Sequence, residues 1–184
     1  MIILTFGVAL WWAAHLFKRL APAARGSLGD RGKGLVALLI VISVALMVIG
    51  YRAADGTYYW GRDPMKVGIN NLLMIFAFYL FAVAGPKGAR VWLGTKLRHP
   101  QLTAIATWAI AHLIVNGDTP SFVLFGGLLV WAIVEIALIN AQDGPWTPPE
   151  RAPFKKEVIA IVATLVTVFI VMGIHYALGV TPWG

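Results

Sequence analysis

The chain has no cysteine among its 184 residues, and this absence removes several kinds of chemistry. Without cysteine there is no disulfide, no thiolate metal site, no cysteine nucleophile and no covalent attachment of a c-type haem. The sequence also has neither a Walker phosphate-binding loop nor a G-x-G-x-x-G segment that follows a strand. Any metal or cofactor must therefore be held by histidine, methionine, carboxylate or backbone atoms.

Charged residues are also scarce, at 12% of the chain, while 59% of the residues are hydrophobic. Soluble domains average about 25% charged residues. The apolar residues form six runs, with no internal repeat, and residues 1–184 are predicted to be a single domain. We therefore predict an all-α fold, a polytopic membrane helix bundle of about six transmembrane helices. The six runs are Ile2–Phe17, Gly34–Tyr51, Val67–Gly85, Leu102–Val115, Phe122–Asn140 and Val158–Val180.

The lengths of these runs differ in how well they suit a bilayer. A membrane-spanning helix needs about 20 mostly apolar residues, with a range of about 17–25. Four runs reach this length, whereas Ile2–Phe17 is marginal and Leu102–Val115 is short. A helix that begins at Pro100 and extends to Asn116 would reach about 25 Å, and proline is favoured at the first helical position. A re-entrant hairpin made by the fourth and fifth runs is the alternative.

The basic residues are distributed unevenly between the connecting segments. Segments one, three and five carry twelve of the fifteen Lys and Arg residues, and segments two and four carry three. Loops on the cytoplasmic side are enriched in Lys and Arg, so this bias predicts that both termini lie outside the cytoplasm. Topology accounts for the net charge of +7, and we expect no nucleic-acid partner.

The fourth run contains the most informative polar side chains. Trp108, His112 and Asn116 are spaced i, i+4, i+8 and share one helix face. A polar or ionisable side chain at membrane depth costs at least about 2.5–3.5 kcal/mol, so His112 is a candidate functional residue. By helix counting, His15 and Glu135 lie at one common depth, and we expect them to pair. The alternative for each histidine is an ordinary interhelical hydrogen bond, worth about 0.6 kcal/mol.

The segment RHPQL…WAIAHLIVNGD around His112, together with WAAHL around His15, resembles the NnrU family of bacterial membrane proteins. The related plant and cyanobacterial 15-cis-zeta-carotene isomerases are similar in sequence. The resemblance extends through most of the chain and includes a terminal helix with His175. It implies a location in the bacterial inner membrane, with the termini then periplasmic.

The resemblance also implies a cofactor and two possible roles. The isomerase branch binds a b-type haem through histidines, which nominates His15 and His112 as axial ligands of the haem iron. His112 with His175 is the alternative pair, because straight helices would place His15 and His112 at different depths. Trp108 and Glu135 are then expected beside the haem, with Glu135 orienting His15. The implied role is a haem-dependent isomerase acting on a hydrophobic carotenoid-like substrate, or an accessory in nitrite and nitric oxide metabolism of denitrifiers.

Two functions without haem remain as alternatives. Arg98-His99-Pro100 at a helix start also occurs in membrane methyltransferases that use S-adenosylmethionine, but the later motif of those enzymes is absent from this chain. A transporter would often show broken helices or symmetric halves, which the sequence does not contain. We interpret His99 as part of an interfacial helix start. The sequence gives no indication of oligomeric state or of catalytic residues.

Overall fold

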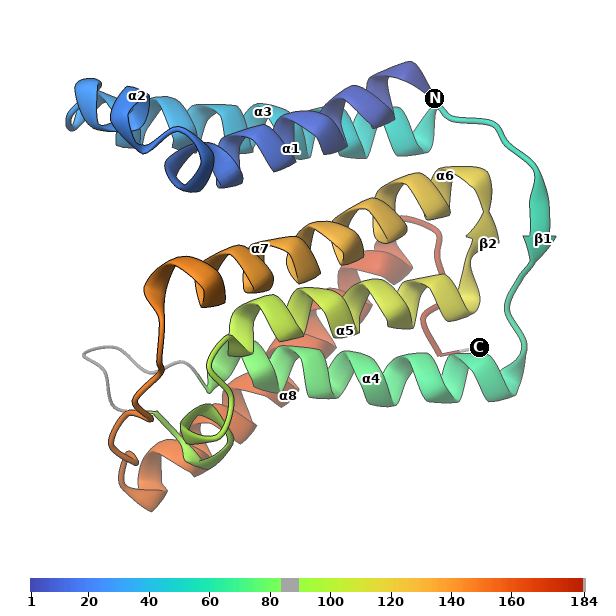
Figure 1. Ribbon diagram of the computed structural model, residues 1–184. Coiled ribbons are helices and arrows are strands. Elements are labelled where there is room, and N and C mark those ends of the chain that lie inside the picture. Colours follow the sequence, from blue (N-terminus) through green and yellow to red (C-terminus); the bar gives the residue numbers. More distant parts are fainter. Residues whose placement is uncertain (84–89, 184) are drawn as a thin grey trace.

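The computed structural model describes residues 1–83 and 90–183 as an antiparallel helix bundle (Figure 1). The polypeptide runs up and down the bundle from one long helix to the next. The helices are α1 (Ile2–Leu20), α2 (Pro22–Ser27), α3 (Arg31–Arg52), α4 (Pro64–Ala82), α5 (Pro100–Val115), α6 (Thr119–Ser121), α7 (Gly127–Asp143) and α8 (Phe154–Ala177). A π-helical segment, Phe122–Gly126, joins α6 to α7, and two short strands are β1 (Tyr58–Trp60) and β2 (Gly117–Asp118).

The helices confirm the predicted all-α membrane bundle. Within the described residues, four helical segments are long and apolar enough to cross a membrane: α3, α4, Thr119–Asp143 and α8. These correspond to the four runs that were long enough by sequence, although Val158–Val180 continues three residues past α8 and the end of Val67–Gly85 lies outside the described residues. α5 is a shorter apolar helix that begins at Pro100, as predicted. Many large apolar side chains on the outer faces are exposed, as expected for a surface that contacts lipid.

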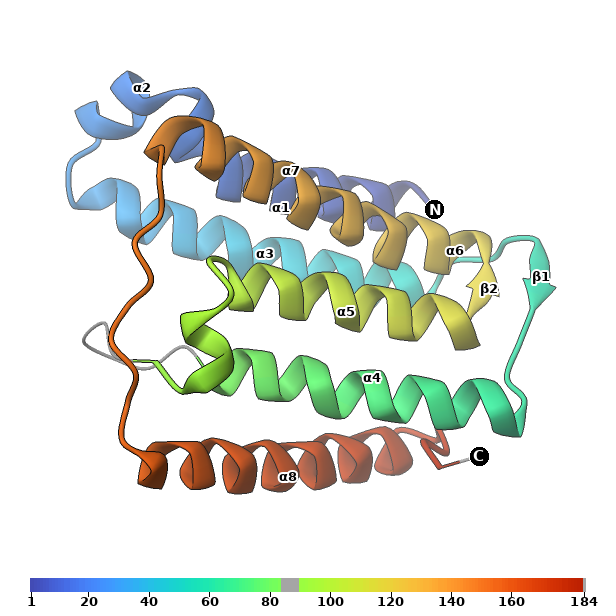
Figure 2. The same cartoon turned by 60° about the horizontal axis from the view of Figure 1, so that its bottom comes forward.

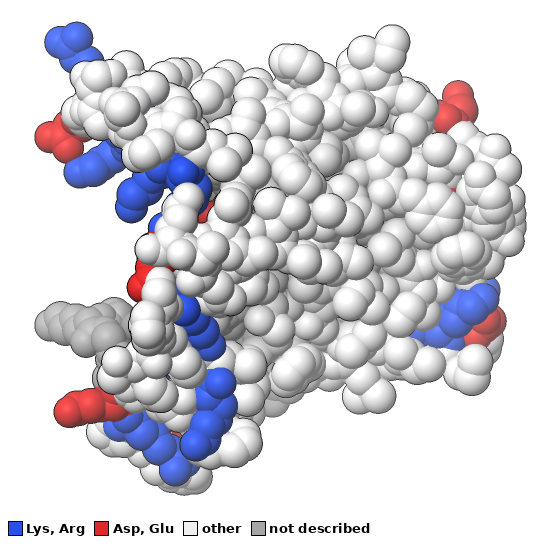
Figure 3. Space-filling model, in the orientation of Figure 1, with Lys and Arg blue, Asp and Glu red and all other residues white. Residues whose placement is uncertain are grey.

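The long helices pack in a fixed order (Figure 2). α1 packs along α3, α4 lies between α5 and α8, and α5 packs against α7. Both termini lie at the end of the bundle that holds β1 and β2 (Figure 1). Most Lys and Arg side chains in view gather at the opposite end, where α1 ends and α5 and α8 begin (Figure 3). The uneven distribution of Lys and Arg in the sequence therefore corresponds to a difference in charge between the two ends of the folded bundle.

Glycines let the α1 and α3 backbones approach closely. A Cβ atom built at Gly50 of α3 would lie 2.5 Å from the Leu4 backbone nitrogen and 2.7 Å from the Leu4 Cα. A Cβ built at Gly7 of α1 would lie 2.9 Å from the Met47 nitrogen. Small residues at helix interfaces are a common means of close packing in membranes, because lipid offers no hydrophobic drive for helix association. Gly127 also packs closely against α1, because a Cβ built there would lie 2.9 Å from the Val8 side chain.

The β1–β2 pair fixes the end of α5. Tyr58 pairs with Asp118 and Trp60 pairs with Gly117 in antiparallel register. The Trp60 indole N–H donates to the Leu113 carbonyl at 3.0 Å, which satisfies a carbonyl of the last turn of α5. The Asp118 carboxylate accepts the Ser121 N–H at 2.8 Å and so caps α6. These contacts fix the position of the helix turn that contains His112.

Replacement of Gly50 by valine is expected to destabilise the bundle, because the added side chain meets the Leu4 backbone, which cannot move aside cheaply. Overpacking of this kind costs about 1–3 kcal/mol. The measurement is the thermal unfolding midpoint of the detergent-purified protein. Gly34→Val in the same helix is the matched control, since a Cβ at Gly34 has no neighbour within 4 Å. Equal loss of stability in both variants would contradict close α1–α3 packing.

Candidate functional site

His112 lies in the last turn of α5, partly buried among aromatic rings. Its Nδ1 atom lies 2.9 Å from the Trp108 carbonyl oxygen, one turn earlier in the helix. A carbonyl only accepts hydrogen bonds, so Nδ1 carries the proton and the lone pair is on Nε2. The imidazole stacks on Phe125 with centroids 4.7 Å apart, and Trp108 packs against both rings. This arrangement holds the ring and leaves the nitrogen that ligates metals unprotonated.

The other two histidines of the apolar runs repeat this hydrogen bond. His15 Nδ1 donates to the Trp11 carbonyl at 2.9 Å, and His175 Nδ1 donates to the Val171 carbonyl at 2.8 Å. His99 differs, because its Nε2 atom lies 2.9 Å from Oδ1 of Asn140, and His99 itself precedes the first residue of α5. The geometry thus separates His99 from the three histidines whose Nε2 lone pairs are available.

The structure does not bring His15 and His112 together. His15 packs against Trp131, with centroids 4.8 Å apart, whereas His112 packs against Phe125. Phe125 and Trp131 are six residues apart, which corresponds to about 9 Å along the helix. His112 and His175 instead lie toward the same end of the bundle. Both of these histidines lie in the last turns of their helices, at the end of the bundle that contains the termini.

A second cluster surrounds His15 at the interface between α1 and α7. The rings of Trp11, His15 and Trp131 are in mutual contact, with centroid separations from 4.0 to 5.3 Å. Within the described part of the chain, three buried side-chain atoms have no hydrogen-bond partner: Trp11 Nε1, Trp131 Nε1 and Glu135 Oε2. All three belong to this interface. Orphaned buried polar atoms are uncommon in native proteins and are recognised signs of a functional site.

Glu135 follows Trp131 by one turn and is 9% exposed. The structure gives no hydrogen bond between Glu135 and His15 in the residues it describes, because the His15 Nδ1 proton is donated to Trp11. Arg19 lies one turn beyond His15 on α1. Arg19 itself binds the Asp143 carboxylate at 2.7 Å and 3.2 Å. The predicted common depth of His15 and Glu135 thus fits their neighbours, although the two side chains do not bond directly.

Trp11 and Phe125 were not among the residues singled out by sequence. The signal for Trp11 was present, since the hexapeptide W-x-x-A-H-L occurs twice, at residues 11–16 and 108–113. In both copies the tryptophan lies one turn before the histidine and contacts it, and the alanine is buried. Phe125 had no such signal, because it reaches His112 from a separate helical segment.

The comparison with known families agrees with these features. A model of the family described as NnrU protein matches residues 3–182, nearly the whole chain. This chain belongs to the NnrU family. No curated protein and no solved structure matches it. Family membership and the apolar helices together establish an NnrU-like helical membrane protein.

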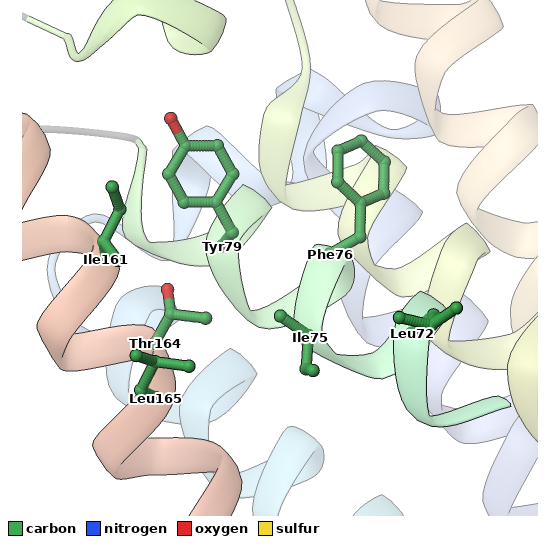
Figure 4. Close-up of a pocket in the computed structure, with 7 residues that line it drawn as sticks. All are labelled: Leu72, Ile75, Phe76, Tyr79, Ile161, Thr164 and Leu165. Carbon is green, nitrogen blue, oxygen red and sulfur yellow. The ribbon is translucent and has the colours of Figure 1, made fainter. Parts of the chain in front are cut away.

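Two cavities of this NnrU protein lie away from the histidines. One, of about 360 Å³, is a groove between α4 and α8 (Figure 4), and another, of about 330 Å³, lies beside Tyr51 and Asp118. Neither is lined by a histidine. The described residues also contain no group of three or more His, Asp or Glu side chains arranged to hold a metal ion. The donor atoms available in the bundle are therefore single imidazoles, together with the orphaned atoms around His15.

Glu135→Leu is expected to raise the thermal unfolding midpoint of the NnrU protein. The substitution removes a buried carboxylate oxygen that has no partner, and replacement of such groups by apolar ones is neutral or stabilising. Thermal unfolding in detergent measures the change, and Leu138→Ala, a truncation at the same helix interface, is the control expected to lower the midpoint. A loss of stability in Glu135→Leu would show that the carboxylate makes a bond on which the fold depends.

Proposed function

We propose that this NnrU-family membrane protein binds one b-type haem, with His112 as an axial ligand. The observation that carries the proposal is the imidazole of His112, whose Nδ1 proton is donated to Trp108 and whose ring is held by Phe125. A ligating histidine usually donates its second nitrogen in this way, which fixes the tautomer and orients the ring. Cofactor sites in helix bundles are built from side chains on facing helices.

The donor chemistry of the bundle fits haem. Two axial imidazoles suffice to hold a b-type haem, so a cluster of three metal ligands is unnecessary. His175 is supported over His15 as the second ligand, because His175 and His112 both lie in the last turns of their helices at the end that holds the termini, whereas His15 packs against Trp131.

When bound, haem would supply a redox-active iron whose axial coordination can change. The residues of the chain then have separate tasks. The Trp108 carbonyl holds the proton on Nδ1 of His112, and Phe125 and Trp108 shield the imidazole from water and lipid. Asn116 closes the end of α5 by donating to the His112 carbonyl at 2.9 Å. These contacts keep Nε2 as the only ring nitrogen able to bind iron.

Two roles for the haem protein are proposed on the family resemblance. One is isomerisation of a cis-carotene-like substrate that enters from the bilayer, and the other is an accessory role in nitrite and nitric oxide metabolism. Incubation of the haem-loaded protein with 15-cis-zeta-carotene, followed by chromatography, separates them. Product formation supports the enzyme, whereas nitric oxide binding without isomerisation supports the accessory role.

The haem proposal is tested by absorption spectroscopy on protein expressed with ample haem. Wild-type protein is expected to show a Soret band, and His112→Ala is expected to lose it or to convert it to a high-spin form. His99→Ala is the matched control and is expected to leave the band nearly unchanged, because the His99 ring bonds Asn140. Loss in His175→Ala but not in His15→Ala supports the His112–His175 pair. A folded wild-type protein without Soret absorption would refute haem binding. The methyltransferase and transporter functions would then be the remaining alternatives.

The membrane orientation is a second proposal, with both termini in the periplasm of a bacterial inner membrane. It rests on the positive-inside bias and on the gathering of Lys and Arg at the end opposite the termini (Figure 3). Fusion of alkaline phosphatase to the C-terminus is expected to give active enzyme, and a green fluorescent protein fused there is expected to stay dark. The reverse pattern would contradict the orientation and would leave the haem proposal untouched.

A further inference from the structure

An apolar groove runs along the outer surface between α4 and α8 (Figure 4). Leu72, Ile75 and Phe76 of α4 form one wall, and Ile161 and Leu165 of α8 form the other. These side chains are between 38% and 70% exposed, and they belong to two segments that are apolar enough to span the membrane. The groove therefore opens toward lipid acyl chains.

Polar groups close one end of the groove. The Tyr79 hydroxyl donates to one carboxylate oxygen of Glu157, and the other carboxylate oxygen accepts the backbone N–H of Trp92 at 2.9 Å. The Glu157 charge is thus engaged by two donors. Arg151 is next to Ala152, which packs against the same apolar cluster as Tyr79. The apolar walls consequently end next to a cation.

This end carries further positive charge. Lys155 and Lys156 are exposed in the first turn of α8, and Arg151 is exposed just before that helix. Among the described residues, none of these three side chains takes part in an ion pair. Positive side chains near a helix N-terminus are unfavourable to the helix dipole. An anion bound beside them would offset that cost.

We propose that the groove and its basic end bind an anionic phospholipid. The acyl chain lies between α4 and α8, and the phosphate lies beside Arg151, Lys155 and Lys156. Charge complementarity selects an anionic lipid, because basic residues next to a membrane-spanning helix attract anionic headgroups. The eight residues from Leu72 to Tyr79 extend about 10 Å along the helix, so the groove accommodates the part of an acyl chain nearest the headgroup. The inference stands apart from the haem proposal, as the groove contains no histidine.

The test is native mass spectrometry of the full-length protein in mild detergent, titrated with phosphatidylglycerol or with phosphatidylcholine of the same acyl chains. We expect phosphatidylglycerol to bind at least about fivefold more tightly. Lys155→Ala combined with Lys156→Ala is expected to remove most of this preference. The matched control is Arg31→Ala with Lys33→Ala, which removes the same charge from the first turn of α3 and is expected to keep the preference.

A second variant tests the groove itself. Leu165→Trp fills the space between the helices without a change in charge, and the 44% exposure of Leu165 lets the larger side chain be accepted. We expect this variant to weaken phosphatidylglycerol binding. Equal binding of the two lipids, or an equal loss in the Arg31 and Lys33 control, would overturn the proposal. Unchanged lipid binding in Leu165→Trp would also overturn it. The same holds if the wild-type protein is a dimer and Leu165→Trp abolishes the dimer, because a second copy of the protein would then occupy the groove.

Discussion

The structure depends on one constraint: a polar group on an apolar helix needs a hydrogen-bond partner nearby in the protein. Most polar side chains of the long helices meet it within their own helix. The hydroxyls of Thr103, Thr107 and Thr164 donate to the carbonyl one turn earlier, as do the Nδ1 atoms of His15, His112 and His175. No water is at hand inside a bilayer to replace such partners. The same local hydrogen bond places the proton of each imidazole on Nδ1, so the lone pair is on Nε2.

The buried polar atoms without a hydrogen-bond partner lie at the interface between α1 and α7. Trp131 and Glu135 of α7, with Trp11 of α1, hold the orphaned atoms of the described residues, while Trp12 on the same side of α1 donates to the Gly127 carbonyl at 3.1 Å. The helical segment Thr119–Asp143 thus contacts both copies of the W-x-x-A-H-L hexapeptide, His112 through Phe125 and His15 through Trp131 further along. An interface that keeps three unsatisfied atoms is less stable than an apolar one would be. Such a cost is typical of functional sites, where stability is given up for activity.

The parts of the structure that depend on single helices were predictable from the sequence. Apolar run length gave the helices and Pro100 gave the start of α5, because both depend on the bilayer and on backbone geometry alone. The offset between His15 and His112 also followed from residue counting along straight helices. The contacts of those histidines did not follow, because they depend on how helices pack. Phe125 reaches His112 through a π-helical segment, and the close approach at Gly50 depends on Leu4, forty-six residues away.

The two hexapeptides differ in a way that bears on their roles. At His112 the neighbouring Phe125 ring has no polar atom, the turn is closed by Asn116 and by the Trp60 indole, and none of the three orphaned atoms of the described residues lies here. At His15 the facing ring is Trp131, whose N–H is orphaned, and a carboxylate follows one turn later. An apolar, satisfied setting suits an imidazole that binds a flat hydrophobic cofactor. A setting with two free donors and one free acceptor suits hydrogen bonds to a polar group instead. The two copies of the hexapeptide therefore lie in different surroundings, set by Phe125 opposite His112 and by Trp131 opposite His15.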